Sequence, residues 1–329
     1  MLYRDINGTW KGKNIPKKFN LIYTQSLIKY FNCLDPLFTK AQSKSDFEFI
    51  LTLLSIRGHQ DAGWDSFETT QDIFNVIHKL KKKIKYNDEQ LHIFLLLYGL
   101  IVEASFPYEL IANLLNIIAD SRYQLNFPDK KTGTHLTPQY PSEKIEKIKH
   151  KAGELGLEKN VQPLTEVFNR ELRNAIFHSD YSIYKNELRL PRVSQVYKIE
   201  DINALINKAL AYHETIIWLV KIYKASNQEP KVIDVHPEFS KDPEEKAVVM
   251  VRKGTGVIGI KDNWTKEQIE AGRIPFRLCR SLPYEQKILD DNPFIALLPP
   301  NKIAKINRVL KSFPNFIRRP IFKILEKFL

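Results

Sequence analysis

Cysteine is scarce in this chain of 329 residues, which contains only Cys33 and Cys279. The two are far apart and form no paired-cysteine motif, which argues against a disulfide framework. The eight histidines are scattered and form no metal-binding pattern such as His-Glu-x-x-His. We therefore expect no bound metal, no cofactor and a reducing, cytoplasmic compartment.

Long hydrophobic runs are also lacking. The N-terminus becomes polar too early for a secretory signal. The most apolar stretch, Leu91–Val102, is short and contains His92, whereas a membrane-spanning helix needs about 20 apolar residues. We interpret this stretch as a buried core helix and expect no transmembrane segment.

Glycine is infrequent, with 12 residues, and there is no internal repeat or low-complexity tract. One cluster, Gly254-Thr-Gly-Val-Ile-Gly259, has the spacing of a dinucleotide-binding fingerprint. That motif must end a strand and open a helix, but here the apolar residues on both sides have strand character. The cluster therefore predicts the turn of a β-hairpin.

What the chain does contain is apolar and basic. Hydrophobic residues make up 43%, including 19 Phe and 14 Tyr, enough for a packed core. The length suits two domains. The formal net charge is +12, which favours a polyanionic partner, either nucleic acid or an anionic membrane surface.

Amphipathic periodicity predicts a largely helical region up to residue 225. Proline is expected to break it near Asp35-Pro36 and at Pro107, and Ser45 has the character of an N-cap. A loop is expected over residues 126–142. The expected helices span 19–38, 45–56, 69–86, 89–105, 108–123, 142–155, 163–177 and 199–226, with a hairpin over 183–197.

The chemically informative segment is Phe168–Tyr181. On one continuous helix, Arg173 would point away from the core face, and His178 would lie about 140° round from it, near the helix C-terminus. The two could then meet one phosphate only if the helix ends before His178 or if a second copy of the helix completes the site.

The segment Arg173-Asn174-Ala-Ile-Phe-His178 resembles the motif of the HEPN superfamily (higher eukaryotes and prokaryotes nucleotide-binding), an Arg and a His separated by four to six residues. A polar residue after the Arg, here Asn174, is typical of active members. The flanking residues resemble prokaryotic HEPN proteins of phage defence. The motif covers six residues, and the helical likeness covers roughly residues 90–225.

This resemblance implies a helical domain that dimerises through its motif helices, unites both motifs in one cleft and cleaves RNA without a metal. The predicted catalytic residues are Arg173, Asn174 and His178. An imidazole can exchange protons near neutral pH, and a guanidinium can fork two hydrogen bonds onto a phosphate. In the alternative, Arg173 pairs with an acid such as Glu166 or Glu171, and His178 merely caps the helix.

We therefore predict a mainly α protein with an N-terminal helical extension (1–89), a HEPN-like helical domain (90–225), a small α+β domain (231–300) and a basic amphipathic tail (301–329). The expected function is a metal-independent endoribonuclease, a toxin or effector of antiviral defence and abortive infection that is held by a regulatory partner or antitoxin. The alternative is a catalytically inactive HEPN scaffold that binds RNA, nucleotide or protein.

The tail carries eight basic residues against one acidic residue, at helical spacing with apolar residues. Three interpretations stay open: it grips the RNA backbone, lies on an anionic membrane or docks on its own core. The candidate RNA contacts are Lys302, Lys305, Arg308, Lys311, Arg318 and Arg319.

Overall fold

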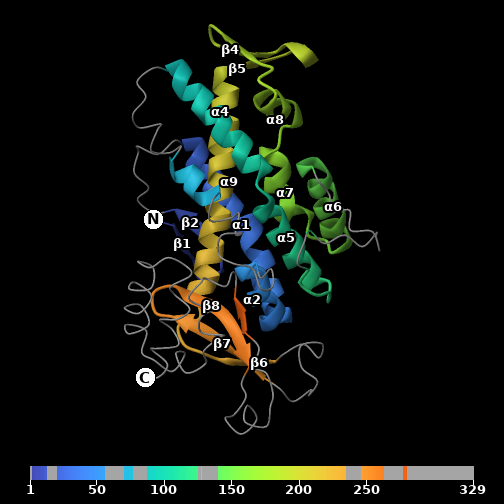
Figure 1. The fold of residues 1–329 in the computed structure, drawn as a ribbon, viewed down its shortest axis with the longest axis vertical. Helices are drawn as coiled ribbons and strands as arrows, with labels where there is room; N and C mark the ends of the chain where they lie inside the picture. The colour runs from blue at the N-terminus through green and yellow to red at the C-terminus, as the bar shows by residue number, and fades with distance from the viewer. Residues whose placement is uncertain are drawn as a thin grey trace, which may run out of the picture. The chain divides into compact units, whose positions relative to one another are not determined.

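The protein is mainly helical, as the sequence predicts (Figure 1). The computed structural model describes residues 2–12, 21–55, 70–76, 87–124, 127, 140–234, 246–262 and 277–279. Most of the expected 126–142 loop and the whole tail lie outside these residues. The named helices are α1 (Leu21–Lys44), α2 (Asp46–Leu54), α4 (Asn87–Glu103), α5 (Ser105–Ile118), α6 (Pro141–Glu154), α7 (Glu158–Val167), α8 (Arg170–Phe177) and α9 (Ile199–Ala225).

The strands form small antiparallel sheets. β1 (Leu2–Arg4) pairs with β2 (Trp10–Gly12). β3 (Ser182–Tyr184), β4 (Glu187–Leu190) and β5 (Gln195–Lys198) form a second sheet between α8 and α9. The third sheet has the order β6 (Val232–Asp234), β7 (Lys246–Arg252), β8 (Gly256–Asp262) and β9 (Arg277–Cys279).

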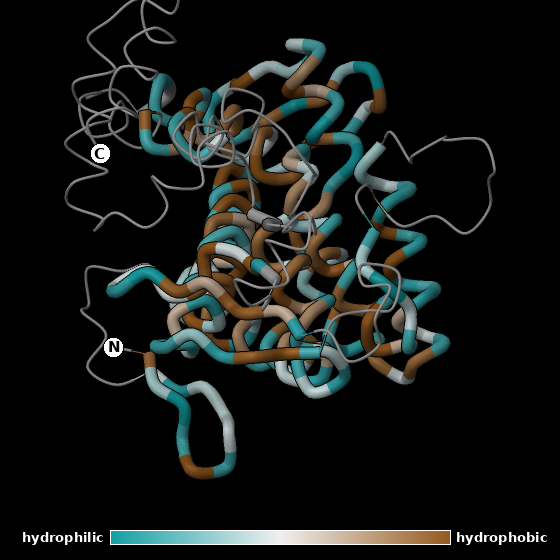
Figure 2. Tube along the Cα trace, turned by 60° about the horizontal axis from the view of Figure 1, so that its bottom comes forward, coloured by the Kyte–Doolittle hydropathy of each residue, from teal (hydrophilic) through white to brown (hydrophobic). Residues whose placement is uncertain are grey.

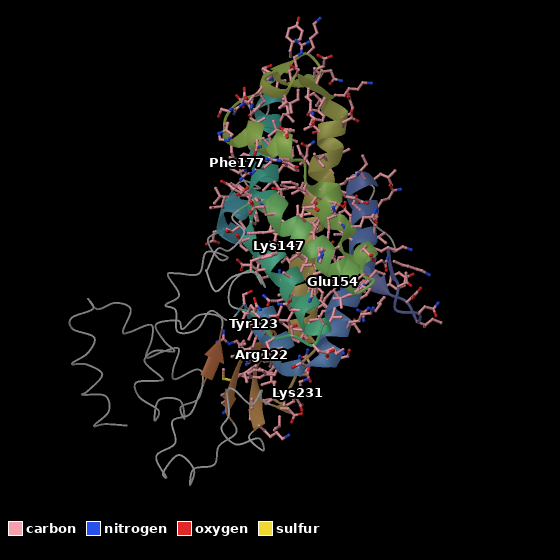
Figure 3. All side chains as sticks on the ribbon, turned by 90° about the vertical axis from the view of Figure 1, so that its right-hand side faces the viewer. Arg122, Tyr123, Lys147, Glu154, Phe177 and Lys231 are labelled. Atoms are coloured by element: carbon pink, nitrogen blue, oxygen red, sulfur yellow. The ribbon has the colours of Figure 1, made fainter. Side chains whose placement is uncertain are left out.

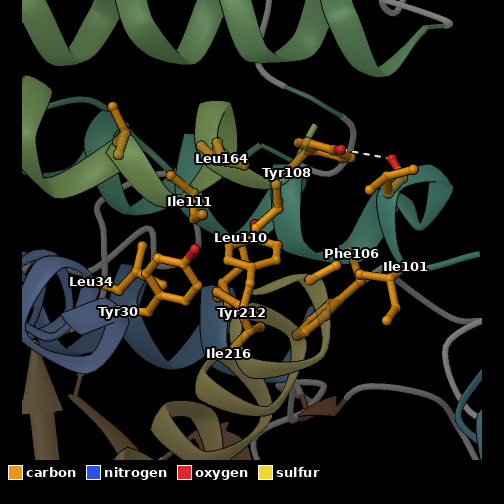
Figure 4. Close-up of a cluster of buried hydrophobic side chains, with 14 of the residues drawn as sticks. Tyr30, Leu34, Ile101, Phe106, Tyr108, Leu110, Ile111, Leu164, Tyr212 and Ile216 are labelled. Atoms are coloured by element: carbon orange, nitrogen blue, oxygen red, sulfur yellow. Dashed lines mark hydrogen bonds between the residues drawn. The ribbon is translucent and has the colours of Figure 1, made fainter. Parts of the chain in front are cut away.

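One hydrophobic core joins the helices on both sides of residue 90. It contains residues of α1, α4, α5, α7 and α9, among them Tyr30, Leu34, Tyr108, Leu164 and Ile216 (Figure 4). In Figure 2 the hydrophobic stretches of these helices gather in the interior, and hydrophilic stretches face outward. Burial of such apolar area is the main force that holds helices together.

A second apolar cluster lies between α2 and the third sheet. Phe47, Ile50, Leu51 and Leu54 pack there with Ile233, Ala247, Val249, Val257 and Ile260. The predicted hairpin is confirmed, because β7 and β8 pair directly across a turn in which Gly254 and Gly256 have φ values of +79° and +80°. The glycine cluster is therefore a turn, not a nucleotide-binding loop.

The break predicted at Asp35-Pro36 is wrong, because α1 runs through Pro36. An internal proline costs about 3 kcal/mol of helix stability. Here α1 packs along α9, and buried Asp35 accepts hydrogen bonds from Trp10 Nε1 and Tyr223 Oη, both at 2.7 Å. These tertiary contacts stabilise the helix through the proline.

The second proline break is misplaced by three residues. α4 and α5 separate at Ala104, and Pro107 lies in the first turn of α5, where a missing N–H costs nothing because the first turn has no intrahelical acceptor. The stretch Glu89–Ile118, which spans both helices, is long and apolar enough to cross a membrane, and 56% of its apolar window is buried. A core helix meets the same criteria, and both helices contribute to the main core.

Candidate functional site

Residues 163–177, predicted as one helix, belong to two helices. α7 ends at Val167 with Phe168 as its C-cap, and α8 begins at Arg170 with Asn169 as its N-cap. The side chain of Asn169 caps α8 by accepting the N–H of Leu172 at 2.9 Å. Buried Tyr98 of α4 holds the junction on both sides: its hydroxyl donates to Val167 O and accepts from the Asn169 N–H, each at 2.9 Å. α8 therefore starts at a fixed point, four residues before Asn174.

α8 packs closely on α4 because Gly99 faces it. Leu172, Ala175 and Ile176 form the buried side of α8. A Cβ atom built on Gly99 would lie 3.2 Å from the Phe177 ring and 3.3 Å from Ile176 Cγ2. The absent side chain lets α8 pack closely against α4. Phe177, the last residue of α8, is 41% exposed (Figure 3).

The sequence predicts that Arg173 points away from the core, but in the structure its side chain turns back to contact a neighbouring helix. Its Nε donates to Glu103 Oε2 at 2.7 Å, its Nη2 lies 2.5 Å from the same oxygen, and its Nη1 donates to Asn174 Oδ1 at 2.9 Å. The guanidinium also lies over the Phe177 ring, 5.4 Å from its centre. The side chain is 18% exposed, so Arg173 lies at the edge of the core, held by α4.

An acid does pair with Arg173, but neither of the two anticipated. Glu166 bonds instead to Lys29 and Tyr30. The partner is Glu103, at the C-terminal end of α4. Two of the five N–H donors of this guanidinium make hydrogen bonds, and a third, on Nη2, contacts the Glu103 carboxylate, so two remain for another acceptor.

His178 terminates α8, as predicted. It is the C-cap residue, and its N–H donates to Asn174 O at 3.0 Å. Ser179 follows in the left-handed conformation, with φ of +53°, and turns the chain away from the helix axis. The His178 side chain is exposed and makes no hydrogen bond to any residue that the structure describes. The helix thus ends before His178, the condition under which the two motif residues can face one ligand.

Two adjoining hollows meet at Asn174 and His178. The larger, about 460 Å³, brings together all three predicted catalytic residues, Arg173, Asn174 and His178. Its other walls are Tyr140, Pro141, Ser142, Glu143, Phe168 and Arg170. The smaller, about 330 Å³, is lined by Asn174 and His178 together with Glu171, Ala175, Asp180, Leu190, Arg192 and Val193.

Two buried residues with polar groups, Lys144 and Tyr108, lie close enough to Glu103 to sense its charge. Lys144 Nζ donates to Ser105 Oγ at 2.9 Å, and burial lowers the pKa of Lys144, partly opposed by Glu109 and Glu103. Burial also raises the pKa of Tyr108, whose hydroxyl donates to Val102 O at 2.7 Å. Glu103 therefore interacts with two cations, with Arg173 directly and with Lys144 at longer range.

Sequence reasoning missed Glu103, Arg170 and Tyr140. No motif marks Glu103, because it lies 70 residues before Arg173 and only folding brings them together. Asp180 lines the smaller hollow, whereas Tyr181 bonds through its hydroxyl to His92 Nδ1 at 2.7 Å. Across the described ranges, no three His, Cys, Asp or Glu side chains gather as a metal site would require.

Comparison with known protein families, with characterised proteins and with solved structures found no match to this chain.

Proposed function

We propose that this protein is a metal-independent endoribonuclease of HEPN type. The observation that carries the proposal is the larger hollow, because Arg173, Asn174 and His178 all line it. An exposed imidazole there is available for proton transfer, and a guanidinium with two remaining donors is available for a phosphate. The site needs no metal, because RNA carries its own nucleophile, the 2′-hydroxyl.

The proposed reaction is transesterification within the RNA chain. The 2′-oxygen attacks the adjacent phosphorus and loses its proton to a base, while the bond to the 5′-oxygen breaks and that oxygen gains a proton. The products are a 2′,3′-cyclic phosphate and a 5′-hydroxyl end. His178 performs one proton transfer, and Arg173 stabilises the negative charge that develops on the phosphate oxygens.

A homodimer would supply the second proton-transfer group, as the HEPN resemblance implies. Exposed apolar side chains surround the motif helix, which supports this part of the proposal. Phe177, Leu96 and Val193 are 41%, 45% and 37% exposed, and they belong to α8, to α4 on which α8 packs, and to the segment before β5. Contact between two copies through this surface would place two His178 side chains near one another.

The second candidate function is a scaffold that binds RNA, nucleotide or protein without cleavage. The Arg173–Glu103 ion pair favours it, since a guanidinium already paired is weaker as a phosphate ligand. The defence role and the antitoxin are proposed on the resemblance alone, and the cytoplasmic location on the scarcity of cysteine.

The two functions are separated by incubating purified protein with total RNA and defined single-stranded oligonucleotides in EDTA. We expect cleavage that leaves cyclic-phosphate ends and falls at least 100-fold in Arg173→Ala and in His178→Ala, because a positioned proton-transfer group contributes about 10²–10⁴-fold. Arg189→Ala is the matched control, because Arg189 is exposed and pairs with Glu187. No cleavage by the folded wild-type protein, or unchanged cleavage by both variants, would favour the scaffold.

A further inference from the structure

The two hollows beside His178 differ in charge and in aromatic content. The larger holds the cations Arg170 and Arg173 against one acid, Glu143. The smaller holds one cation, Arg192, against two acids, Glu171 and Asp180. A polyanion therefore finds a more favourable potential in the larger hollow.

Arg170 is the available cation of the larger hollow. It is exposed, and no ion pair or hydrogen bond engages its side chain within the part of the chain that the structure describes. Arg173, by contrast, is held by Glu103 and Asn174. An unpaired guanidinium loses no existing partner when it binds a phosphate, so Arg170 can bind one at little cost.

Tyr140 provides an aromatic surface in the same hollow. It precedes the first residue of α6, its side chain is 55% exposed, and no described residue bonds to its hydroxyl. An exposed aromatic ring beside a phosphate-binding cation is how proteins hold unpaired bases. Phe168, two residues before Arg170 in the sequence, adds apolar surface to the wall.

We infer that the larger hollow is a binding site for one nucleotide of a single-stranded RNA, with its base stacked on Tyr140 and its phosphate paired with Arg170. This inference rests on the proposed function, whose reacting phosphate lies at Arg173 and His178. The inferred subsite lies next to that phosphate, in the larger hollow. No phosphate is expected to bind at Arg192, in the smaller hollow. The subsite also selects unpaired RNA, because a base within a duplex is already stacked.

The test measures binding of a fluorescent single-stranded oligonucleotide with 2′-O-methyl groups, which cannot be cleaved by 2′-hydroxyl attack. Tyr140→Ala should weaken binding roughly 10-fold, within the range for one stacked base, and Tyr140→Phe should restore it. Arg170→Ala should weaken binding and reduce the slope of log K against log salt by about 0.7, the value for one single-strand phosphate contact.

Arg192→Ala is the matched control and should leave both affinity and slope nearly unchanged. A duplex of the same length should bind with no dependence on Tyr140. Equal effects of Arg170→Ala and Arg192→Ala, loss of binding in Tyr140→Phe, or no binding to the wild-type protein would overturn the inference.

Cleavage of unmodified RNA, measured in parallel, keeps the two proposals apart. Cleavage that does not depend on Tyr140 or Arg170 would refute the proposed subsite and still support the proposed ribonuclease activity. Binding that depends on both residues, without any cleavage, removes the ribonuclease and leaves the subsite.

Discussion

Glu103 sets both the position and the effective charge of Arg173. Two of the guanidinium nitrogens contact one carboxylate oxygen, which fixes the plane of the group while neutralising part of its charge. A fixed orientation favours reaction, because reacting groups must be held in a productive geometry. The negative charge of Glu103 also weakens the attraction between Arg173 and the RNA phosphates. The same ion pair therefore has opposite effects on binding and on catalysis.

Glu103→Gln should separate these effects. Removing the negative charge should tighten RNA binding by roughly 2- to 5-fold, since about 1 kcal/mol is typical of a partly exposed charge interaction. The loosened guanidinium should lower kcat by about 10-fold. Single-turnover kinetics with varied protein concentration measure both quantities.

Glu146→Gln is the control for Glu103→Gln. It removes the same charge from an acid that is 70% exposed on α6 and pairs with Lys149. Parallel changes in the two variants, or a rise in both Kd and kcat for Glu103→Gln, would contradict the assigned role of Glu103.

At the scale of single residues, the sequence predicts those members of the site that lie close together along the chain. Asn174 and His178 were predicted from the motif, and the structure places them with Arg173 on one hollow. The restraint on Arg173 was not predictable, because its partner comes from another helix. Periodicity reports only which face of a helix a side chain leaves from, and a long side chain such as Arg173 can still turn back toward a neighbouring acid.

At the scale of elements, the separation of α7 from α8 determines where the motif lies. The apolar period continues through Phe168, so the sequence predicts one helix. Tyr98 offers a hydroxyl to both ends of the junction, and the Asn169 side chain replaces a helical hydrogen bond. The prolines of α1 and α5 show the opposite error, because the sequence predicts a helix break at each and neither helix breaks there. Tertiary packing stabilises α1 through Pro36, and Pro107 lies in the first turn of α5, where proline is tolerated.

Asn169→Ala should therefore destabilise α8. Loss of an N-cap side chain costs about 0.5–2 kcal/mol, and the bond from Asn169 Nδ2 to Tyr197 Oη, 3.2 Å long, is lost with it. We expect a lower midpoint in urea unfolding followed by circular dichroism. Cleavage should also fall at urea concentrations where the protein remains folded, because the start of α8 positions Arg173.

Asn207→Ala provides the comparison for Asn169→Ala. Asn207 lies on α9, and its side chain donates only to Asn203 O one turn earlier, at an exposed position. Its substitution should change the unfolding free energy by less than about 0.5 kcal/mol. Equal destabilisation by the two substitutions would show that the α8 cap has no special role.

At the scale of the whole molecule, Asp35 connects parts of the chain that are far apart in sequence. Its carboxylate accepts from Trp10 of β2 and Tyr223 of α9 and pairs with Arg4 of β1. The residue is 4% exposed. A buried carboxylate is tolerable only when it is paired and hydrogen-bonded, and here the N-terminal hairpin and α9 supply the partners.

Asp35→Ala should lower the unfolding free energy by about 3–5 kcal/mol, because it leaves the buried donors of Trp10 and Tyr223 and the charge of Arg4 without their partner. Thermal and urea unfolding measure the loss. Asp120→Asn is the control, since Asp120 is 75% exposed in its pair with Lys44, asparagine tolerates its left-handed φ of +53°, and the pair should contribute under about 1 kcal/mol. A loss below 1 kcal/mol in Asp35→Ala would mean that the network adds little to stability.

The pairing of α1 with α9 also has a consequence for the order of events during synthesis on the ribosome. Asp35 and Tyr223 are 188 residues apart, a separation that takes roughly 10–40 s to translate. Throughout that interval α9 is not there to cover the face of α1 against which it packs, and the motif of α8 emerges before α9 does. The residues of the site are thus synthesised before α9, the helix that completes the core. If the protein cleaves RNA, the messenger and ribosome that produce it are exposed to that activity only after the last core helix has been made.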